Sequence, residues 1–203
     1  MRSQRSLARL IAEPIVLAIV LALIVRTAFF RIYAIPSPSM TPTLQVGDHI
    51  VVTPFRDDAP ARGDVVVFRS PLADDELMVK RVIATAGDLV ESRGGRIAIG
   101  GRTLAEPYLR EMNTSGAIAP MIVPAGCYFV MGDNRANSYD SRGWGVLPAE
   151  RVVGRVRLVL WSSGDGSTLR GAAEPIARAA ARVDPLLPPR VPIGFHRLFL
   201  PVR

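Results

Sequence analysis

The sequence predicts a mainly β fold, in which a coiled antiparallel β-sheet follows one N-terminal transmembrane helix. Two observations support this fold class. Residues 10–30 form a long apolar stretch, whereas residues 31–165 contain short β-rich runs that are broken by Gly and Pro. Many short strands with turn signals between them are typical of antiparallel all-β proteins. The length of 203 residues and the hydrophobic content of 49% fit one domain with appendages.

The positive charge is concentrated at the two ends of the chain. Residues 1–31 carry five Arg and one Glu, residues 32–165 carry 14 basic and 15 acidic residues, and residues 166–203 carry six Arg and two acidic residues. Basic ends around a nearly neutral body favour contact with anionic lipid over a nucleic-acid groove. We therefore expect a lipid bilayer as a partner and no nucleic acid.

Metal ligands and disulfide partners are scarce. Cys127 is the only cysteine, which excludes an intramolecular disulfide and a cysteine-built metal site. The two histidines, His49 and His196, leave little material for a zinc site. We expect no metal and no organic cofactor.

Residues 1–9 are predicted to be a basic cytoplasmic N-terminus and residues 10–30 a membrane anchor. As a helix, 21 residues would span roughly 30 Å, about the thickness of the hydrocarbon core. A cleavable secretory signal is the alternative, because Arg2, Arg5 and Arg9 precede an apolar region of suitable length. No small-x-small cleavage site follows promptly, which favours a retained anchor. Arg residues flank both sides, and their count favours a cytoplasmic N-terminus.

The body is predicted to contain six strands separated by glycine-rich turns. The candidate strands are 49–53, 64–69, 76–84, 96–99, 127–131 and 151–161. The sequence contains no internal repeat.

Residues 166–203 lose this strand character. Residues 169–183 could form a short Ala/Arg helix, and residues 185–203 contain five prolines. Two interpretations stay open for this basic, Pro-rich tail. It packs over the body, or it contacts the membrane surface through apolar residues such as Phe195 and Phe199 and the Arg residues near them.

Directly after the anchor, three prolines restrict the backbone around two serines, Ser37 and Ser39. A serine that attacks a carbonyl needs such fixed placement, because orientation contributes much of the rate. A rigid connector with incidental serines would look the same on this stretch alone.

Lys80 is the single lysine among 25 basic residues. Strand alternation places it on one face with Met78 and Val82, and places Arg81 on the other face. An ammonium between apolar neighbours is poorly solvated, which lowers the pKa of a lysine and makes a neutral amine available as a general base. Arg cannot serve in this way because it stays protonated in proteins. The alternative is a strand lysine whose amine reaches solvent.

Residues 131–145 are rich in Gly, Asn, Asp and Ser and lack apolar periodicity. Asp140 and Arg142 could form a charge-assisted pair that fixes this loop. A polar surface loop is the alternative.

Together these motifs resemble the conserved boxes of bacterial type I signal peptidases. The resemblance covers roughly residues 10–161 and rests on four motifs. They read Pro36-Ser37-x-Ser39-Met40-x-Pro42-Thr43-Leu44, Gly63-Asp64-Val65-Val66, Lys80-Arg81-Val82-Ile83 with Gly87-Asp88, and Gly132-Asp133-Asn134-Arg135-x-x-Ser138-x-Asp140-Ser141-Arg142-x-Trp144-Gly145. The combination, in this order and spacing, is highly specific.

The resemblance implies a membrane-bound serine endopeptidase with its catalytic domain, residues 31–165, on the outer face of the cytoplasmic membrane. Such enzymes cleave N-terminal signal peptides from exported preproteins after small residues, in an Ala-x-Ala pattern. By resemblance, Ser39 is the nucleophile, Lys80 is the general base, and the Ser39 N–H and the Ser37 hydroxyl form the oxyanion hole. Ser138 would orient the Lys80 amine. The supporting residues of the same loop would be Asp133, Arg135, Asp140 and Arg142.

Two departures from the family pattern concern backbone geometry. Pro38 stands where the family usually has Gly, and because proline restricts φ it affects how Ser37 is presented. The strand after Lys80 continues into Ala84-Thr85-Ala86-Gly87-Asp88, where a Gly-Leu-Pro-Gly-Asp-like turn is commoner. His49 as the base of a Ser-His-Asp triad is disfavoured.

Three alternative functions remain. One is a specialised Ser/Lys peptidase that matures a pilin or a conjugation protein. Another is a catalytically inactive, membrane-tethered scaffold that only binds signal sequences, against which the presence of Ser39, Lys80 and Ser138 argues. A self-cleaving Ser/Lys repressor is disfavoured because no DNA-binding domain precedes the dyad.

Overall fold

The computed structural model describes residues 12–21, 30–73, 75–109, 117–163 and 200–202. The chain divides into two units, Met1–Arg31 and Ile32–Arg203. In the first unit, residues 12–21 form a helix. Within the described ranges, no helix reaches the length and apolarity that a membrane crossing requires.

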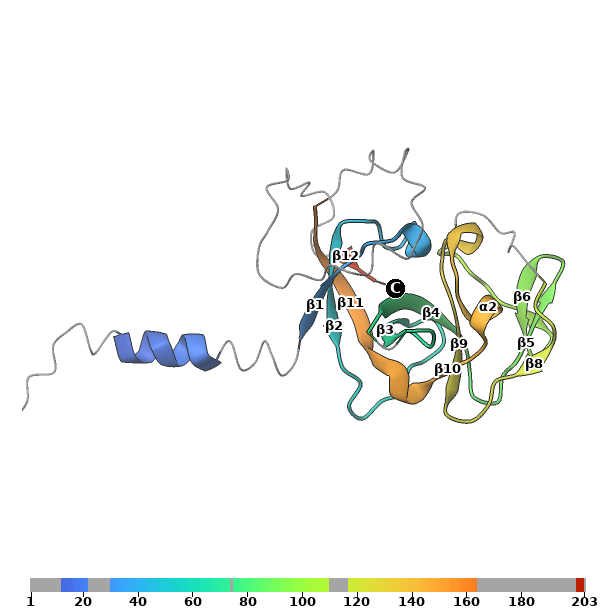
Figure 1. Cartoon of the computed structure of the whole chain (residues 1–203), viewed down its shortest axis with the longest axis horizontal. Helices are drawn as coiled ribbons and strands as arrows, with labels where there is room; N and C mark the ends of the chain where they lie inside the picture. The colour runs from blue at the N-terminus through green and yellow to red at the C-terminus, as the bar shows by residue number, and fades with distance from the viewer. Residues whose placement is uncertain (1–11, 22–29, 74, 110–116, 164–199, 203) are drawn as a thin grey trace, which may run out of the picture. The chain divides into compact units, whose positions relative to one another are not determined.

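The second unit is built on a large antiparallel sheet that curls around its core (Figure 1). The strands run in the spatial order β1 (Arg31–Ala34), β2 (Asp48–Thr53), β11 (Val152–Ser162), β3 (Val65–Arg69), β4 (Leu77–Thr85), β9 (Cys127–Met131) and β10 (Leu147–Pro148). Register shifts interrupt the pairing of β11 with both β3 and β2. Such bulges bend a strand and increase its twist, which lets β11 follow the curl.

Core residues cover both faces of the central strands. In β3, Val65 and Val67 belong to one hydrophobic cluster, whereas Val66 and Phe68 belong to another. This explains why β3 is a continuous apolar run rather than an alternating one. By contrast, β2 alternates buried and half-buried positions along its length. The strand β3, which pairs with β4, is therefore covered on both faces.

A second, four-stranded sheet lies beside the first. It pairs β7 (Arg102–Thr103), β6 (Arg96–Ile99), β5 (Leu89–Arg93) and β8 (Met121–Ile122) in that order. Its core cluster includes Val90 and Ile97, and it also contains Ile83 and Ala84 from the end of β4. The two sheets thus share apolar packing where β4 leaves the large sheet.

The six predicted strands are all present, with ends shifted by no more than one residue. The mainly β fold with an antiparallel sheet is therefore confirmed. Sequence patterning missed β1, β5 and several two-residue strands. Of the tail, only residues 200–202 are described, and Leu200–Pro201 form β12, which pairs with β11. The expected helix over 169–183 and most of the 185–203 segment lie outside the described residues.

Candidate active site

Ser39 lies in a tight turn between β1 and β2. Residues Pro38–Met40 form a short 3₁₀ helix, η1, with Ser37 in extended conformation at its N-cap. Pro38 occupies the start of this helix, where a fixed φ is compatible and the missing N–H costs no hydrogen bond. Met40 and Leu44 are almost fully buried in the core and anchor the turn. Pro38 is thus compatible with the backbone of this turn.

Lys80 lies in β4 and reaches the same turn. Its Nζ is 2.7 Å from Ser39 Oγ, and Ser37 Oγ is 3.3 Å from Ser39 Oγ. Lys80 is only 3% exposed and Ser39 9%. In register, Lys80 pairs with Val66 and Arg81 with Val65, so the two cations project to opposite faces, as the alternation predicts.

Burial lowers the pKa of Lys80 to about 8. The negative charge of Asp140 opposes this shift, and the positive charge of Arg142 adds to it. Roughly a tenth of Lys80 side chains would then be neutral at pH 7, far more than for a solvated lysine. A neutral amine within hydrogen-bond distance of a hydroxyl can remove its proton.

Asp140 organises the loop that follows β9. It accepts hydrogen bonds from Ser138 Oγ at 2.8 Å, from the Gly132 N–H at 3.0 Å and from Arg142, with two bonds of 2.8 Å. Burial alone would raise the pKa of Asp140, but the hydrogen bonds from Arg142 and Gly132 lower it below its usual value. The carboxylate therefore stays ionised at neutral pH. The charge-assisted pair suggested by the sequence is present.

Gly132 marks a close approach between this loop and the serine turn. A Cβ at this position would lie 2.5 Å from the Ser39 carbonyl oxygen and 2.3 Å from Ser138 Oγ. The Asn134 N–H also donates to the Ser39 carbonyl at 3.0 Å. The loop and the turn are thus locked together, and Ser138 is brought next to the Ser39 backbone. The Ser138 hydroxyl donates a hydrogen bond to Asp140.

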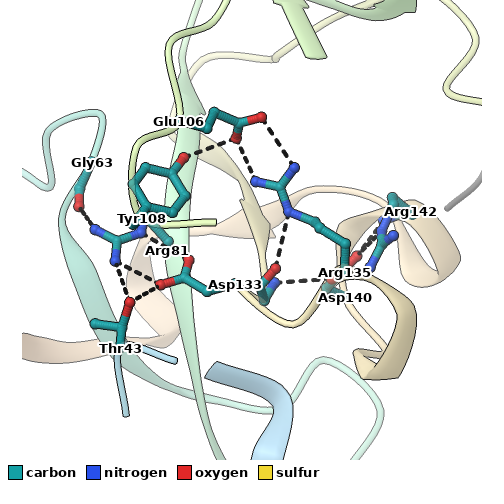
Figure 2. A network of polar contacts seen from close by, with 10 residues as sticks. Thr43, Gly63, Arg81, Glu106, Tyr108, Asp133, Arg135, Asp140 and Arg142 are labelled. Carbon is teal, nitrogen blue, oxygen red and sulfur yellow. Dashed lines mark hydrogen bonds and ion pairs between the residues drawn. The ribbon is translucent and has the colours of Figure 1, made fainter. Parts of the chain in front are cut away.

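Asp133 and Arg135 belong to a buried network of polar contacts (Figure 2). Asp133 forms two hydrogen bonds with Arg81, of 2.9 Å to Nε and 2.7 Å to Nη2, and also accepts from Thr43. Arg135 pairs with Glu106. The network reaches the sequence neighbours of the dyad through Arg81, which is adjacent to Lys80 and is bound by Asp133.

The other predicted groups lie away from this chemistry. His49 stacks on Trp161 at 4.3 Å between ring centroids, and its Nδ1 is 3.2 Å from the Gly47 carbonyl oxygen. In the described ranges, no cluster of His, Cys, Asp or Glu could hold a metal ion.

Sequence reasoning did not single out several residues of the site. Arg81 and Asn134 lie inside the recognised motifs, and this position is the only feature of the sequence that could have identified them as site residues. Glu106 and Tyr108 belonged to no motif, and nothing in the local pattern marked them. The missed residues are Thr43, Arg81, Glu106, Tyr108 and Asn134.

Comparison with known proteins assigns the chain to a family. Residues 8–161 match the family model described as signal peptidase, peptidase S26. The signal peptidase I of Leptolyngbya laminosa is 39% identical over 158 residues, covering 73% of this chain and 77% of that protein. Thylakoidal processing peptidase 1, chloroplastic, of Arabidopsis thaliana is 35% identical over 158 residues, covering 71% of this chain and 46% of that protein.

A signal peptidase I from Bacillus amyloliquefaciens is 36% identical over 165 residues, covering 75% of this chain and 85% of that protein. The crystal structure of a signal peptidase I from Enterococcus faecalis matches 48% of this chain and 97% of its own, with 32% identity and a TM-score of 0.44. The family model alone spans more than half of the sequence. The chain therefore belongs to the S26 family of signal peptidases, serine endopeptidases that cleave signal peptides from preproteins.

Proposed function

We propose that Ser39 is the nucleophile and Lys80 the general base of this signal peptidase. The observation that carries the proposal is the 2.7 Å separation of Lys80 Nζ and Ser39 Oγ in a buried setting. The lowered pKa of Lys80, about 8, supports the same role because a base acts only when unprotonated.

In this mechanism, neutral Lys80 takes the proton of Ser39 Oγ as the oxygen attacks the scissile carbonyl carbon of the preprotein. The tetrahedral intermediate collapses, the peptide C–N bond breaks, and Lys80 returns the proton to the leaving amine of the mature protein. A water molecule then gives a proton to Lys80 and attacks the acyl-enzyme. The resulting tetrahedral intermediate collapses, the ester bond to Ser39 Oγ breaks, and Lys80 returns its proton to Oγ. The signal peptide then leaves with a free carboxyl group, and the Ser39 hydroxyl and neutral Lys80 are restored.

The oxyanion of each tetrahedral intermediate is assigned to the Ser39 N–H and the Ser37 hydroxyl. Ser39 is the second residue of η1, and the first N–H groups of a helix have no partner within the helix. The Ser37 hydroxyl lies 3.3 Å from the attacking oxygen, on the same turn. Two donors fixed in advance stabilise the charge that develops on the carbonyl oxygen.

The loop after β9 supplies the supporting groups. Asp140, held ionised by Arg142 and Gly132, orients the Ser138 hydroxyl. Ser138 in turn steadies the Lys80 amine, and Asp133 and Arg135 hold the backbone of the loop in place. The roles of Asp140, Asp133 and Arg135 are supported by the contacts above. The role of Ser138 toward the Lys80 amine rests on the family resemblance.

We further propose that residues 10–30 anchor the enzyme in the cytoplasmic membrane as a single span. The catalytic domain then faces the outer side, where exported preproteins present their signal peptides. Cleavage follows small residues in an Ala-x-Ala pattern, as expected for the family.

The direct test incubates the full chain, purified in detergent, with an unrelated preprotein and sequences the new N-terminus. Cleavage after a small-x-small site, abolished by Ser39→Ala, is the expected result. Cleavage that persists in Ser39→Ala would overturn the proposal. Repeating the assay with several unrelated preproteins separates a general signal peptidase from a specialised maturation peptidase. Peptide binding without any cleavage would indicate the inactive scaffold.

A further inference from the structure

Glu106 is a buried carboxylate that the proposed chemistry does not use. It lies in the segment between β7 and β8, outside the recognised motifs, and is 6% exposed. Its two oxygens accept from both terminal nitrogens of Arg135, and Oε1 also accepts from the Tyr108 hydroxyl at 2.8 Å. Figure 2 shows these contacts converging on one carboxylate.

On one side, Glu106 is linked to the serine turn through Arg135. The Arg135 Nε donates to the Gly132 carbonyl at 3.0 Å, while its other nitrogens hold Glu106. Gly132 is the position where an added Cβ would clash with both the Ser39 carbonyl oxygen and the Ser138 side chain, so its backbone passes close to both. Fixing the Arg135 guanidinium therefore fixes the part of the loop that meets the proposed nucleophile and its supporting serine.

On the other side, Glu106 is linked to β4 through Tyr108. The Arg81 guanidinium lies over the Tyr108 ring, with 4.0 Å from Cζ to the ring centroid. Arg81 is adjacent to Lys80 and is itself bound to Asp133. Burial and the Glu106 charge raise the pKa of Tyr108, so its hydroxyl stays protonated and keeps donating at neutral pH.

A buried ion pair of this kind is weak evidence for stability. The cost of removing two charges from water can exceed their mutual attraction, so well-packed apolar residues often serve stability equally well. The charged arrangement instead fixes the orientation of the Arg135 guanidinium. The planar guanidinium of Arg135 is held at all three nitrogens, by Glu106 and by Gly132, in one geometry.

We infer that Glu106 is a positioning residue of the peptidase reaction. From the segment between β7 and β8, Glu106 holds Arg135 and thereby keeps Gly132 against the Ser39 turn. Through Tyr108, Glu106 also contacts the Arg81 side of β4. The inference rests on the proposed roles of Ser39, Lys80 and Ser138. It concerns the alignment of the dyad and not substrate binding.

The test compares Glu106→Gln with Glu91→Gln in the full chain. Glu91 is a matched control, because it is a buried glutamate of the smaller sheet whose ion-pair partner, Arg93, lies in the same strand. With kcat normalised to the folded fraction from circular dichroism, Glu106→Gln should lower kcat roughly tenfold to hundredfold at unchanged KM. Glu91→Gln should leave both constants unchanged. Equal behaviour of the two variants would overturn the inference.

A double-mutant cycle separates positioning from a purely structural role. If Glu106 acts through Gly132 and Ser138, Glu106→Gln should cost less than about threefold in kcat once Ser138→Ala is present. Independent, multiplicative losses would contradict the inference. If Glu106→Gln does not fold, Tyr108→Phe decides, since it keeps the ring under Arg81 and removes only the hydroxyl. A several-fold loss of kcat supports the inference, and full kcat overturns it.

The same assays keep this inference apart from the proposed function. If Ser39→Ala is inactive and Glu106→Gln is fully active, only the proposed role of Glu106 is refuted. Active Ser39→Ala would refute the dyad itself.

Discussion

Lys80 and Arg81 are neighbours in β4 and almost equally buried, at 3% and 1% exposure, yet their surroundings are opposite. Arg81 faces a carboxylate that binds it through two hydrogen bonds, and it lies over an aromatic ring. Lys80 faces the hydroxyl of Ser39, and its amine forms no ion pair within the described part of the chain. The strand β4 thus carries Arg81, which is paired with a carboxylate, on one face, and Lys80, which lies against a hydroxyl, on the other.

The difference shows how burial can serve two purposes. Arg81 forms an ion pair with Asp133 and thereby ties the loop after β9 to the sheet. Without a paired carboxylate, Lys80 has its pKa lowered by burial to about 8. The first arrangement fixes the loop beside the site. The second supports the proposed role of Lys80 as a base, at the cost of some stability.

The largest expected effect comes from replacing Lys80 with a residue that cannot lose its proton. Lys80→Arg keeps the charge but removes the possibility of a neutral base, so kcat should fall roughly 10²–10⁴-fold or more. Ser39→Ala should lose a comparable amount, and the double variant little further, because members of one catalytic unit are not additive. Preprotein cleavage in detergent measures these rates. A Lys80→Arg enzyme with near-normal cleavage would end the Ser/Lys interpretation.

Removing the carboxylate that pairs with Arg81 should chiefly lower the stability of the fold. Asp133→Asn leaves a buried guanidinium without its counter-charge, so the free energy of unfolding should fall by about 3–5 kcal/mol. Urea denaturation of the full chain in detergent measures this change. The control is Arg62→Gln, which breaks the partly exposed pair with Asp88 and should cost less than about 1 kcal/mol. Similar losses in both variants would refute the contrast between the two settings.

Removing the Lys80 charge should stabilise the fold while abolishing activity. Below pH 8 the lysine is charged in both folded and unfolded chains, and burial penalises the folded one, so Lys80→Met should be more stable by about 3 kcal/mol. As pH rises from about 8 to 10.5, only the unfolded chain keeps the proton and the wild type gains stability. The difference should therefore shrink over that window. A constant difference across this pH range would contradict the lowered pKa.

The mildest test leaves the chain unchanged and varies pH. Because only neutral Lys80 accepts a proton, kcat/KM should rise about tenfold per pH unit below the pKa of the free enzyme and level off above about pH 8. The profile should follow one ionisation, since Asp140, whose pKa is lowered, stays ionised throughout this range. Preprotein cleavage from pH 6 upward measures the curve, with circular dichroism confirming that the fold persists. A flat profile between about pH 6 and 9 would exclude Lys80 as the base.

Much of the site could be predicted because its members lie in local motifs. The prolines around Ser39 indicate a stiff turn, and strand alternation separates Lys80 from Arg81 before any contact is known. The smaller sheet was harder to predict. The β5 sequence Leu89–Arg93 contains Glu91 and Ser92, both of which are well covered in the fold, so its polar residues concealed a strand.

By itself, the sequence determined the strands with clear apolar patterns, the single lysine that we propose as the base, and the motif residues that identify the family. Local periodicity and residue chemistry are sufficient for these. Only the tertiary structure decided which charges meet: Asp133 with Arg81, 52 residues apart, and Arg135 with Glu106, 29 residues apart. Such pairs depend on sheet register and curl, which bring distant segments together without leaving a periodic trace in either one. For the same reason, only the fold could show that the Lys80 amine lies against the Ser39 hydroxyl.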